Sequence, residues 1–342
     1  MIEFGSDFHR CDSPFHGETT LGTLFPSRQL YASGRMALLA VAKQEGWRRL
    51  WVPAYFCHEI LDVWKKEIDL CLYDDYPMAK DDEAVVRALP YKEGDALLRM
   101  NFFGLRGKRS NNGISVPVIE DHSHALTSDW ALHSDADWCI ASLRKSLPLA
   151  IGGVLWSPKG LQLPKEPRTD VTCDKLAAER YEAMAMKAQY LREGGDKEAF
   201  RRKFVETEEA LDGIDGIAAI DKESGRILRK LDITKWNEQK QKNWQVACKL
   251  LERFEVVGRD EASAPFSIII IMQDKEARDR FRKYLIEKSI YPATLWNIPE
   301  GVPFARCKDF GERMLSIHCD ARYSEQDIRQ MCEEINNYGT NH

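Results

Sequence analysis

The sequence predicts an α/β protein in which a large domain with a mostly parallel sheet precedes a smaller C-terminal α+β domain. Short apolar runs alternate with helical patterns from Ser33 to about Ser157, as in βαβ units. From Asp174 to about Glu209 the composition turns to Ala, Glu, Lys, Arg and Met, which indicates long helices. The last third mixes strands and helices again. We therefore expect a large domain over residues 1–230, with a sheet core at about 33–160 and a helical extension at 174–210, and a long helix with a small domain over residues 231–342.

The strands of the sheet core are expected where short β-rich apolar runs are bounded by turn residues. These runs are Arg49 to Val52, Leu70 to Tyr73, Ala96 to Met100, Val116 to Ile119, Trp138 to Ala141 and Val154 to Trp156. Arg35 to Glu45 is expected to be a helix closed by Gly46, and His58 to Lys66 carries apolar residues at helical spacing. We expect these helices to cover the faces of the sheet.

The second half is expected to be helical before it becomes α+β. The long helical region after Asp174 is interrupted at Gly194 and Gly195. The elements expected beyond it are a helix from Thr234 to Phe254, a strand from Phe266 to Met272, a helix from Asp274 to Ser289, a strand from Met314 to His318, and a helix from Ser324 to Asn336 with Ser324 as its cap.

The composition describes an ordinary globular protein, with 44% hydrophobic and 30% charged residues. The formal net charge of −5 gives no support to a nucleic-acid partner. We expect no membrane span, because no run of about eighteen apolar residues occurs. The nine cysteines are scattered without a C-x-x-C pair, so we expect buried free thiols, no metal site and a reducing cytoplasm.

Polar residues follow two of the expected strands. Glu120-Asp121-His122-Ser123-His124 comes after the fourth run, and Ser142-Leu143-Arg144-Lys145 comes after the fifth, with Gly152-Gly153 just beyond. Open α/β sheets bind ligands at the carboxyl ends of their strands. An acid, a histidine, a hydroxyl and a lysine brought together there match the needs of pyridoxal phosphate, which takes a carboxylate at its ring nitrogen, donors at its phosphate and an amine for a Schiff base.

Each of these residues also has a plainer interpretation. Lys145 is either the Schiff-base lysine or a solvated surface group, and Ser142 then offers its hydroxyl to the phosphate. Asp121 either pairs with the pyridinium N–H or caps a helix. His124 either donates to the phenolic oxygen of the cofactor or packs in the core, and for His122 we favour capping or core packing.

Two further segments precede these. Ser33-Gly34-Arg35 stands before an apolar helical pattern, where free N–H groups either cradle a phosphate or are simply capped by Ser33. The stretch from Trp51 to Cys57 places aromatic residues at a strand end, where one of them stacks on a pyridine ring. No G-x-G-x-x-G or G-x-x-x-x-G-K-[ST] motif is present, so neither a dinucleotide fold nor a nucleotide hydrolase is indicated.

The order of these segments resembles that of the fold-type I pyridoxal phosphate enzymes, and among them the DegT/DnrJ/StrS-like sugar aminotransferases. Ser33-Gly34-Arg35 looks like the family's phosphate-binding "SGT" element, and Val52-Pro53-Ala54-Tyr55 looks like its "vPaYtf" segment. Val118 to Asp121 with His124 is similar to its "viEDaAq/h" segment. Lys145 followed by Gly152-Gly153 resembles its lysine and the Gly-Gly pair behind it.

The resemblance implies a three-layer, aspartate aminotransferase-like fold and a set of roles. By resemblance, Lys145 carries the cofactor, Asp121 pairs with the pyridine nitrogen, and His124 contacts the phenolic side. The implied phosphate ligands are Ser33, Gly34, Arg35 and Ser142. The resemblance also implies a homodimer with its sites at the subunit interface, which transfers an amino group from glutamate to a keto sugar carried on a nucleotide.

Three departures from the family pattern bear on these roles. Ser142 lies three residues before Lys145, whereas the family's serine lies five before its lysine. The "GYNYR" signature is absent, and either Asn237 or Asn243 takes the place of its asparagine. The ring-stacking position falls at Phe56 or Cys57, of which we take Phe56 as the candidate.

The sequence thus predicts an aminotransferase and leaves two alternatives open. One is a pyridoxal phosphate-dependent lyase or dehydratase, although family dehydratases generally have histidine where this chain has Lys145. The other is a degenerate fold-type I protein with a binding or regulatory role. The identity of the keto acceptor is not encoded in a readable motif, and we expect it to be set by loops around Leu105 to Asn112 and Trp296 to Phe304 and by the partner subunit.

Overall fold

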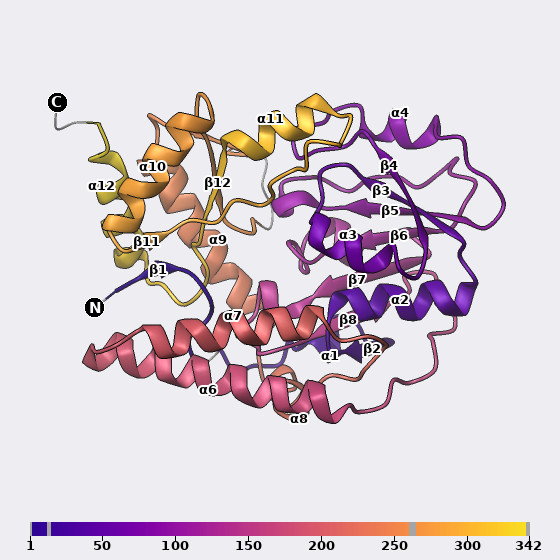
Figure 1. Cartoon of the computed structure of the whole chain (residues 1–342), viewed down its shortest axis with the longest axis horizontal. Helices are drawn as coiled ribbons and strands as arrows, with labels where there is room; N and C mark the ends of the chain where they lie inside the picture. Colours follow the sequence, from indigo (N-terminus) through magenta and orange to yellow (C-terminus); the bar gives the residue numbers. More distant parts are fainter. Residues whose placement is uncertain (1, 12–14, 260–264, 340–342) are drawn as a thin grey trace.

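The computed structural model describes residues 2–11, 15–259 and 265–339. Figure 1 shows a central sheet with its helices, a C-terminal unit to one side, and a pair of long helices running beneath both. None of the helices in these ranges is long and apolar enough to span a membrane.

The central sheet has seven strands in the order β2-β8-β7-β6-β5-β3-β4. The five strands β3 to β7 are parallel to one another. β8 is antiparallel to both of its neighbours, β7 and β2. This confirms the mixed, mostly parallel sheet. Its strands are β2 (Arg28–Tyr31), β3 (Arg49–Pro53), β4 (Asp69–Tyr73), β5 (Asp95–Met100), β6 (Val118–Asp121), β7 (Trp138–Ser142) and β8 (Gly153–Trp156).

Two strands differ from the prediction. β6 begins at Val118 instead of Val116, because Pro117 has no N–H to give to the sheet, and it extends to Asp121. β2 is not predicted, since its residues Arg28 and Gln29 interrupt the apolar pattern, and it lies at the edge of the sheet. Its pairing with β8 is what makes that edge antiparallel.

Apolar side chains bury both faces of the sheet because neighbouring residues of a strand point in opposite directions. Leu98, Ile119 and Ile140 belong to the apolar cluster on the face of α2 (Gly34–Glu45). Their neighbours belong to a second cluster on the opposite face, which includes Leu97, Val118 and Cys139. The sheet is therefore the middle of three layers, as predicted.

Short helices follow the strands. Ser33 caps α2 as predicted, and Gly46 ends it with a φ of 65°. The predicted helix after β3 is α3 (His58–Trp64), and three further short α-helices before residue 170 were not predicted. These are α1 (Leu21–Leu24), α4 (Asp82–Arg87) and α5 (Asp129–Leu132). Two short 3₁₀ helices, η1 (Phe102–Gly104) and η2 (Leu143–Lys145), lie directly after β5 and β7.

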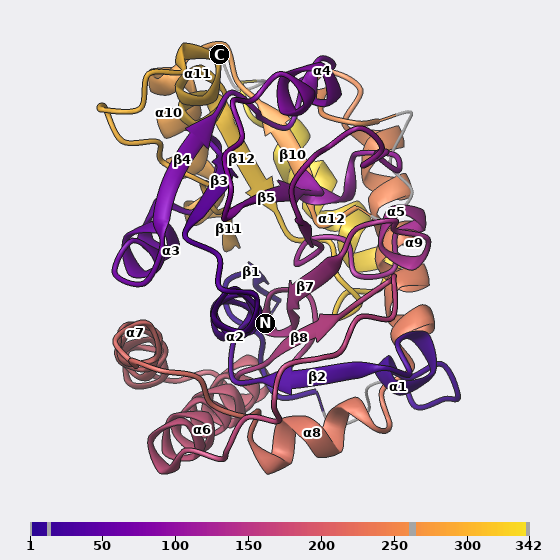
Figure 2. The same cartoon turned by 90° about the vertical axis from the view of Figure 1, so that its right-hand side faces the viewer.

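The helical extension forms a hairpin of two long helices, α6 (Val171–Glu193) and α7 (Glu198–Asp212), separated where Gly194 and Gly195 were expected to interrupt it. Figure 2 shows this hairpin to the left of the end of the sheet that carries β8 and β2. The short α8 (Lys222–Leu228) leads from it to α9 (Ile233–Leu250), which ends before the predicted Phe254.

The C-terminal unit packs α9, α10 (Lys275–Glu287) and α12 (Glu325–Asn336) around an antiparallel sheet in the order β12-β10-β9. Ser324 caps α12 in a complete capping box, as its position predicted. The remaining elements are β9 (Glu255–Val256), β10 (Ile268–Ile271), β11 (Ile290–Tyr291), α11 (Ala305–Arg313) and β12 (Met314–Ile317).

The N-terminal strand β1 (Phe4–Gly5) pairs in parallel with β11, which places the start of the chain against the C-terminal unit. The Gly5 N–H also donates to the Tyr323 hydroxyl at 2.9 Å. The division into residues 1–230 and 231–342 stays a prediction.

Candidate active site

Two adjoining cavities lie at the carboxyl ends of β6 and β7. The larger has a volume of about 530 Å³ and the smaller about 50 Å³. Five residues line both cavities and so mark their junction, namely Cys57, Ile60, Arg144, Lys145 and Asp212. The predicted lysine therefore lies where the two spaces meet.

The smaller cavity is built around the start of α2. Ser33, Gly34 and Arg35 line it together with Ser142. The Ser33 hydroxyl accepts a hydrogen bond from the Met36 N–H at 3.3 Å. The first N–H groups of any helix have no carbonyl partner inside the helix. Such a helix end favours an anion.

Glycine permits the close approach that shapes this end of the cavity. A Cβ atom on Gly153 would lie 2.2 Å from the carbonyl carbon of Ser33, and one on Gly34 would lie 3.1 Å from the Ser142 nitrogen. Gly153 therefore allows β8 to lie against the start of α2.

Asp121 and Ser142 are joined through Ser123. One Asp121 carboxylate oxygen accepts from the Ser123 N–H at 2.7 Å, and the Ser123 hydroxyl accepts from the Ser142 N–H at 2.7 Å. All three side chains line the smaller cavity. Ser123 was not predicted as a site residue, although its place between Asp121 and His124 in the sequence was a usable signal.

Lys145 ends the short helix η2 after β7. Its ammonium nitrogen lies 5.5 Å from the centre of the Trp296 ring, which comes from the C-terminal unit. An ammonium over a tryptophan face is attracted by the ring quadrupole, so Trp296 helps to orient the amine.

His124 lies deep in the larger cavity and is held as the neutral imidazole. Its Nδ1 accepts a hydrogen bond from the Phe103 N–H at 3.2 Å, so the ring proton is on Nε2. Burial lowers the pKa of His124 well below its usual range, and the charges of Lys145 and Lys240 lower it further. The ring also stacks on Phe266 at 4.3 Å. His124 is therefore a hydrogen-bond donor through Nε2 at neutral pH.

The Arg35 side chain points away from the role of a phosphate ligand. Its two terminal nitrogens donate to the carbonyl oxygens of Leu211 and Asp212, both at 2.8 Å. The guanidinium thus fixes the end of α7 against α2, and the backbone N–H of Arg35 remains for an anion. The phosphate role of Arg35 stays a prediction in that form.

Phe56 and Cys57 both line the smaller cavity. The Phe56 ring lies 5.6 Å from Trp64 and 5.9 Å from Trp296, so it is packed among aromatic rings. Burial raises the pKa of the Cys57 thiol, which is therefore protonated at neutral pH. The ring-stacking role of Phe56 stays a prediction.

The side chains of the two candidate asparagines of α9 donate hydrogen bonds to backbone carbonyl groups. Asn237 donates to the carbonyl oxygen of Ile233 at 2.9 Å. Asn243 donates to the carbonyl oxygens of Asp320 and Tyr323 at 3.1 and 2.8 Å. Within the described ranges, neither residue lines the two cavities.

A compact polar cluster lies on the opposite face of the sheet, because Glu120 points away from Asp121. Glu120, His122 and Cys139 have possible metal-ligand atoms within 4.8 Å of one another. The Glu120 carboxylate accepts from Ser134 at 2.6 Å and from Asn111 at 2.7 Å, and lies 3.1 Å from His122 Nε2. These donors satisfy the carboxylate without an ion, and His122 belongs to the core.

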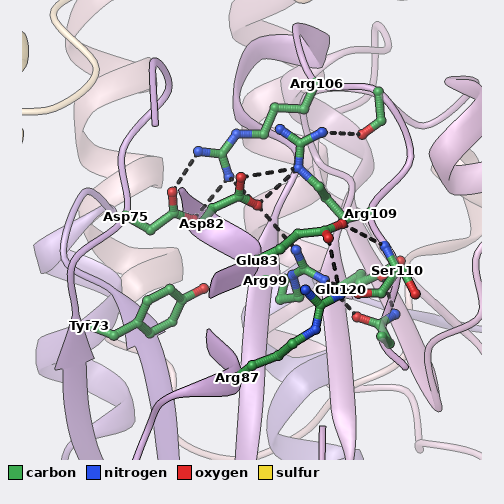
Figure 3. Close-up of polar contacts among 12 residues, drawn as sticks. Tyr73, Asp75, Asp82, Glu83, Arg87, Arg99, Arg106, Arg109, Ser110 and Glu120 are labelled. Atoms are coloured by element: carbon green, nitrogen blue, oxygen red, sulfur yellow. Dashed lines mark hydrogen bonds and ion pairs between the residues drawn. The ribbon is translucent and has the colours of Figure 1, made fainter. Parts of the chain in front are cut away.

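The loop expected to set specificity is largely tied into an ion-pair network. Arg106 forms two hydrogen bonds with Asp75 at 2.9 and 2.6 Å, and Asp82 pairs with both Arg99 and Arg109 (Figure 3). The specificity role of the loop around Leu105 to Asn112 stays a prediction.

Sequence reasoning missed a charged group that α7 brings to the larger cavity. The Glu208 carboxylate pairs with Arg144 and lies 3.0 Å from Arg180 of α6. These residues are brought together only by the packing of the helical hairpin, so no local pattern announces them.

Comparison of the sequence with known protein families finds no match, and no curated protein matches it. Solved structures, in contrast, match over most of the chain, and they have the fold-type I architecture of pyridoxal phosphate-dependent aminotransferases. The predicted fold class is thereby confirmed.

Three of these structures illustrate the match. PseC from Helicobacter pylori, an aminotransferase of pseudoaminic acid biosynthesis, has a TM-score of 0.62 at 12% identity over 98% of this chain and 99% of that chain. Spr1654 from Streptococcus pneumoniae, assigned as a sugar aminotransferase, has a TM-score of 0.63 at 12% identity over 95% and 92%. A DegT DnrJ EryC1 StrS aminotransferase from Brucella abortus has a TM-score of 0.57 at 14% identity over 94% and 88%.

Proposed function

We propose that the protein is a pyridoxal phosphate-dependent aminotransferase that moves an amino group from an amino acid such as glutamate to a keto acceptor, namely a nucleotide-linked keto sugar. The observation that carries this proposal is the convergence of Lys145, Asp121, His124 and the start of α2 on two adjoining cavities. The fold shared with sugar aminotransferases supports it.

The residues around the two cavities fit the cofactor. The helix end at Ser33, Gly34 and Arg35, with Ser142, would hold its phosphate. Asp121, whose orientation is fixed by the Ser123 N–H, would pair with the ring nitrogen. His124, a donor through Nε2, would bind the phenolic oxygen.

Pyridoxal phosphate supplies an electrophilic carbon for amines and a ring that takes up an electron pair. The chain supplies the rest. Lys145 Nζ would bind the cofactor, and as a free amine it would move the proton of the substrate. Asp121 would hold a positive charge on the ring nitrogen, and Phe266 and Trp296, which stack on His124, would give the site an aromatic wall.

The nature of the substrate is proposed from the structural neighbours. DesI, which has a TM-score of 0.62 at 13% identity, was solved with its TDP-sugar product. Spr1654 was solved in PLP and PMP forms. These relatives support a nucleotide-linked sugar as acceptor and a cofactor that alternates between its aldehyde and amine forms.

We also propose that the protein works as a homodimer in the cytoplasm, without a nucleic-acid or membrane partner. The dimer follows from the resemblance. A reducing compartment agrees with buried free thiols such as Cys139, Cys173 and Cys307. The net charge of −5 supports the absence of a nucleic-acid partner.

The test is the visible absorption spectrum of the purified protein with pyridoxal phosphate, before and after glutamate. The wild type is expected to show the band of lysine-bound cofactor and to lose it when glutamate is added. Lys145→Ala is expected to show no such band, and Lys65→Ala, which changes an exposed lysine, is the matched control.

The two alternatives give different results. A lyase or dehydratase would form the band without releasing pyridoxamine phosphate when glutamate is added. A degenerate binding protein would form no band at all. Either result would refute the aminotransferase proposal.

A further inference from the structure

We propose that Arg144 and Arg180 form a clamp for the carboxylate of the amino donor, and that Glu208 of α7 occupies this clamp until the donor displaces it. The inference rests on the proposed function and adds to it a subsite and a competing internal ligand. Both arginines and Glu208 line the larger cavity together with Lys145.

The clamp consists of two guanidinium groups that face one carboxylate. One Glu208 oxygen accepts from Arg144 Nη2, and the other lies 3.0 Å from Arg180 Nη1. A carboxylate held between two arginines is the arrangement by which proteins bind anionic substrates. Here a side chain of the same protein fills the position that such a substrate would take.

The pairing of Glu208 with Arg144 leaves the Nε–H group of the guanidinium without a partner. Arg144 Nε is buried and has no hydrogen-bond partner. A guanidinium binds a carboxylate best through two parallel N–H bonds, for which Nε and Nη2 form one suitable edge. A donor carboxylate that used both nitrogens would satisfy Arg144 better than Glu208 does.

The two sides of the clamp differ in how firmly they are held. The Arg180 side chain is 9% exposed and also pairs with Asp7 at 2.6 Å, and the Arg144 side chain is 17% exposed. The Glu208 side chain is 38% exposed, which makes it the most exposed of the three. Displacement therefore means that Glu208 turns outward while the guanidiniums keep their places.

The charges favour an anion once Glu208 leaves. Arg180 stays paired with Asp7, whereas Arg144 loses its ion pair with Glu208 and keeps its positive charge beside Lys145. Although burial would raise the pKa of Glu208, Arg144 and Arg180 lower it below its usual range. Glu208 is thus a charged competitor at neutral pH.

The position of the clamp favours the donor carboxylate over the diphosphate of a nucleotide. Arg144 directly precedes Lys145 in the chain, and both line the junction of the two cavities. In an amino acid the carboxylate is attached to the carbon that carries the reacting amine. A nucleotide diphosphate is separated from the reacting sugar carbon by several bonds.

The experiment measures the binding of glutarate by calorimetry to the full-length protein loaded with pyridoxal phosphate. Glutarate has the two carboxylates of glutamate and no amine, so it binds without reacting. Glu208→Gln is expected to lower its Kd by about tenfold, since an internal ligand that leaves the clamp open one tenth of the time raises the apparent Kd by that factor. Glu209→Gln, an equal charge change on an exposed neighbour, is expected to leave Kd unchanged.

The arginine is tested in the same background. Adding Arg144→Gln to Glu208→Gln is expected to abolish the tenfold gain in glutarate affinity. Adding Arg144→Lys instead is expected to keep only part of this gain, because an ammonium cannot bind a carboxylate in the bidentate way of a guanidinium. The inference is overturned if Glu208→Gln leaves Kd unchanged, or if the double variant binds glutarate as tightly as Glu208→Gln alone. Tighter binding of pyrophosphate than of glutarate to Glu208→Gln would assign the clamp to the acceptor and also overturn it.

The same titration without cofactor separates this inference from the proposed function. Suppose that the protein forms no lysine-bound cofactor band, but Glu208→Gln binds glutarate tenfold more tightly than the wild type. The clamp is then supported and the aminotransferase proposal is refuted. If the protein forms the band but Glu208→Gln does not change glutarate binding, the proposed function is supported and the clamp is refuted.

Discussion

The carboxyl ends of the central strands carry two polar clusters of opposite character. Next to β4 and β5, Asp75, Asp82, Arg99 and Arg106 are buried and paired with one another (Figure 3). Next to β6 and β7, Asp121, Ser142 and Lys145 face two cavities. Both clusters lie at the same edge of one sheet.

The difference shows how charge at a strand end is put to structural or chemical use. A buried charge that has its partner within the protein has no binding capacity left, and removing that partner is costly. A polar group that faces a cavity keeps its capacity for a ligand, and the start of α2 and Arg144 Nε show this. Changes in the two clusters should therefore have separable effects on stability and on activity.

The largest effect is expected from Lys145→Ala. Loss of the group that moves the proton is expected to lower the rate of transamination by about 10³-fold to 10⁴-fold, with thermal stability close to that of the wild type. Single-turnover kinetics with glutamate measure the rate. A variant that retained more than about a tenth of the rate would place the chemistry elsewhere.

The converse is expected in the ion-pair network. Asp75→Ala leaves Arg106 buried without its partner and is expected to cost about 3–5 kcal/mol of unfolding free energy, measured with denaturant. Asp62→Ala breaks a pair of exposed side chains with Lys65 and is expected to cost less than about 1 kcal/mol.

A double variant sharpens this result. Asp75→Leu with Arg106→Met removes both charges and is expected to recover most of the stability, because no buried charge is left unpaired. If the double variant were as unstable as Asp75→Ala, the network would contribute more than its own pairing.

An intermediate effect is expected from Gly153→Ala, which should change both stability and cofactor binding. The added Cβ would lie 2.2 Å from the Ser33 carbonyl carbon, so β8 and the start of α2 must separate. We expect a loss of about 1–3 kcal/mol in stability, together with weaker cofactor binding in a spectroscopic titration. Gly301→Ala, where nothing lies within 4 Å of the added Cβ, is the control and should change neither. Unchanged cofactor affinity in Gly153→Ala would separate the helix end from the phosphate.

The smallest effect concerns pH. Because the folded pKa of His124 is depressed, the unfolded chain binds a proton at this residue first, and stability falls as the pH falls below about 6.5. The contribution is at most about 1.4 kcal/mol per pH unit. His124→Gln should make the loss of unfolding free energy between neutral and mildly acidic pH shallower, whereas exposed His133→Gln should not. Equal slopes in the wild type and His124→Gln would mean that His124 is protonated in the folded state.

The positions of site residues at or just after the end of a strand were the easiest to predict from the sequence. Asp121 and Ser142 are the last residues of β6 and β7, which are neighbours in the sheet. His124 and Lys145 follow within three residues, and the apolar runs locate both strands. The start of α2 was also predictable, since Ser33 and the apolar helix behind it are local signals.

The sequence could not predict what distant packing brings in. Glu208 and Arg180 reach the larger cavity because α6 and α7 fold back as a hairpin, and Trp296 reaches Lys145 from the C-terminal unit. The partners of the Arg35 side chain were unpredictable for the same reason, because Leu211 and Asp212 lie far along the chain. Contacts of this kind leave no period or motif in the sequence.

The pairing of β1 with β11 has a consequence for synthesis on the ribosome. Phe4 pairs with Ile290, so β1 cannot pair until the intervening residues have been synthesised. The central sheet needs no such wait, since its strands all lie between residues 28 and 156. We expect the nascent chain to build its central sheet early and to pair β1 with β11 late in synthesis.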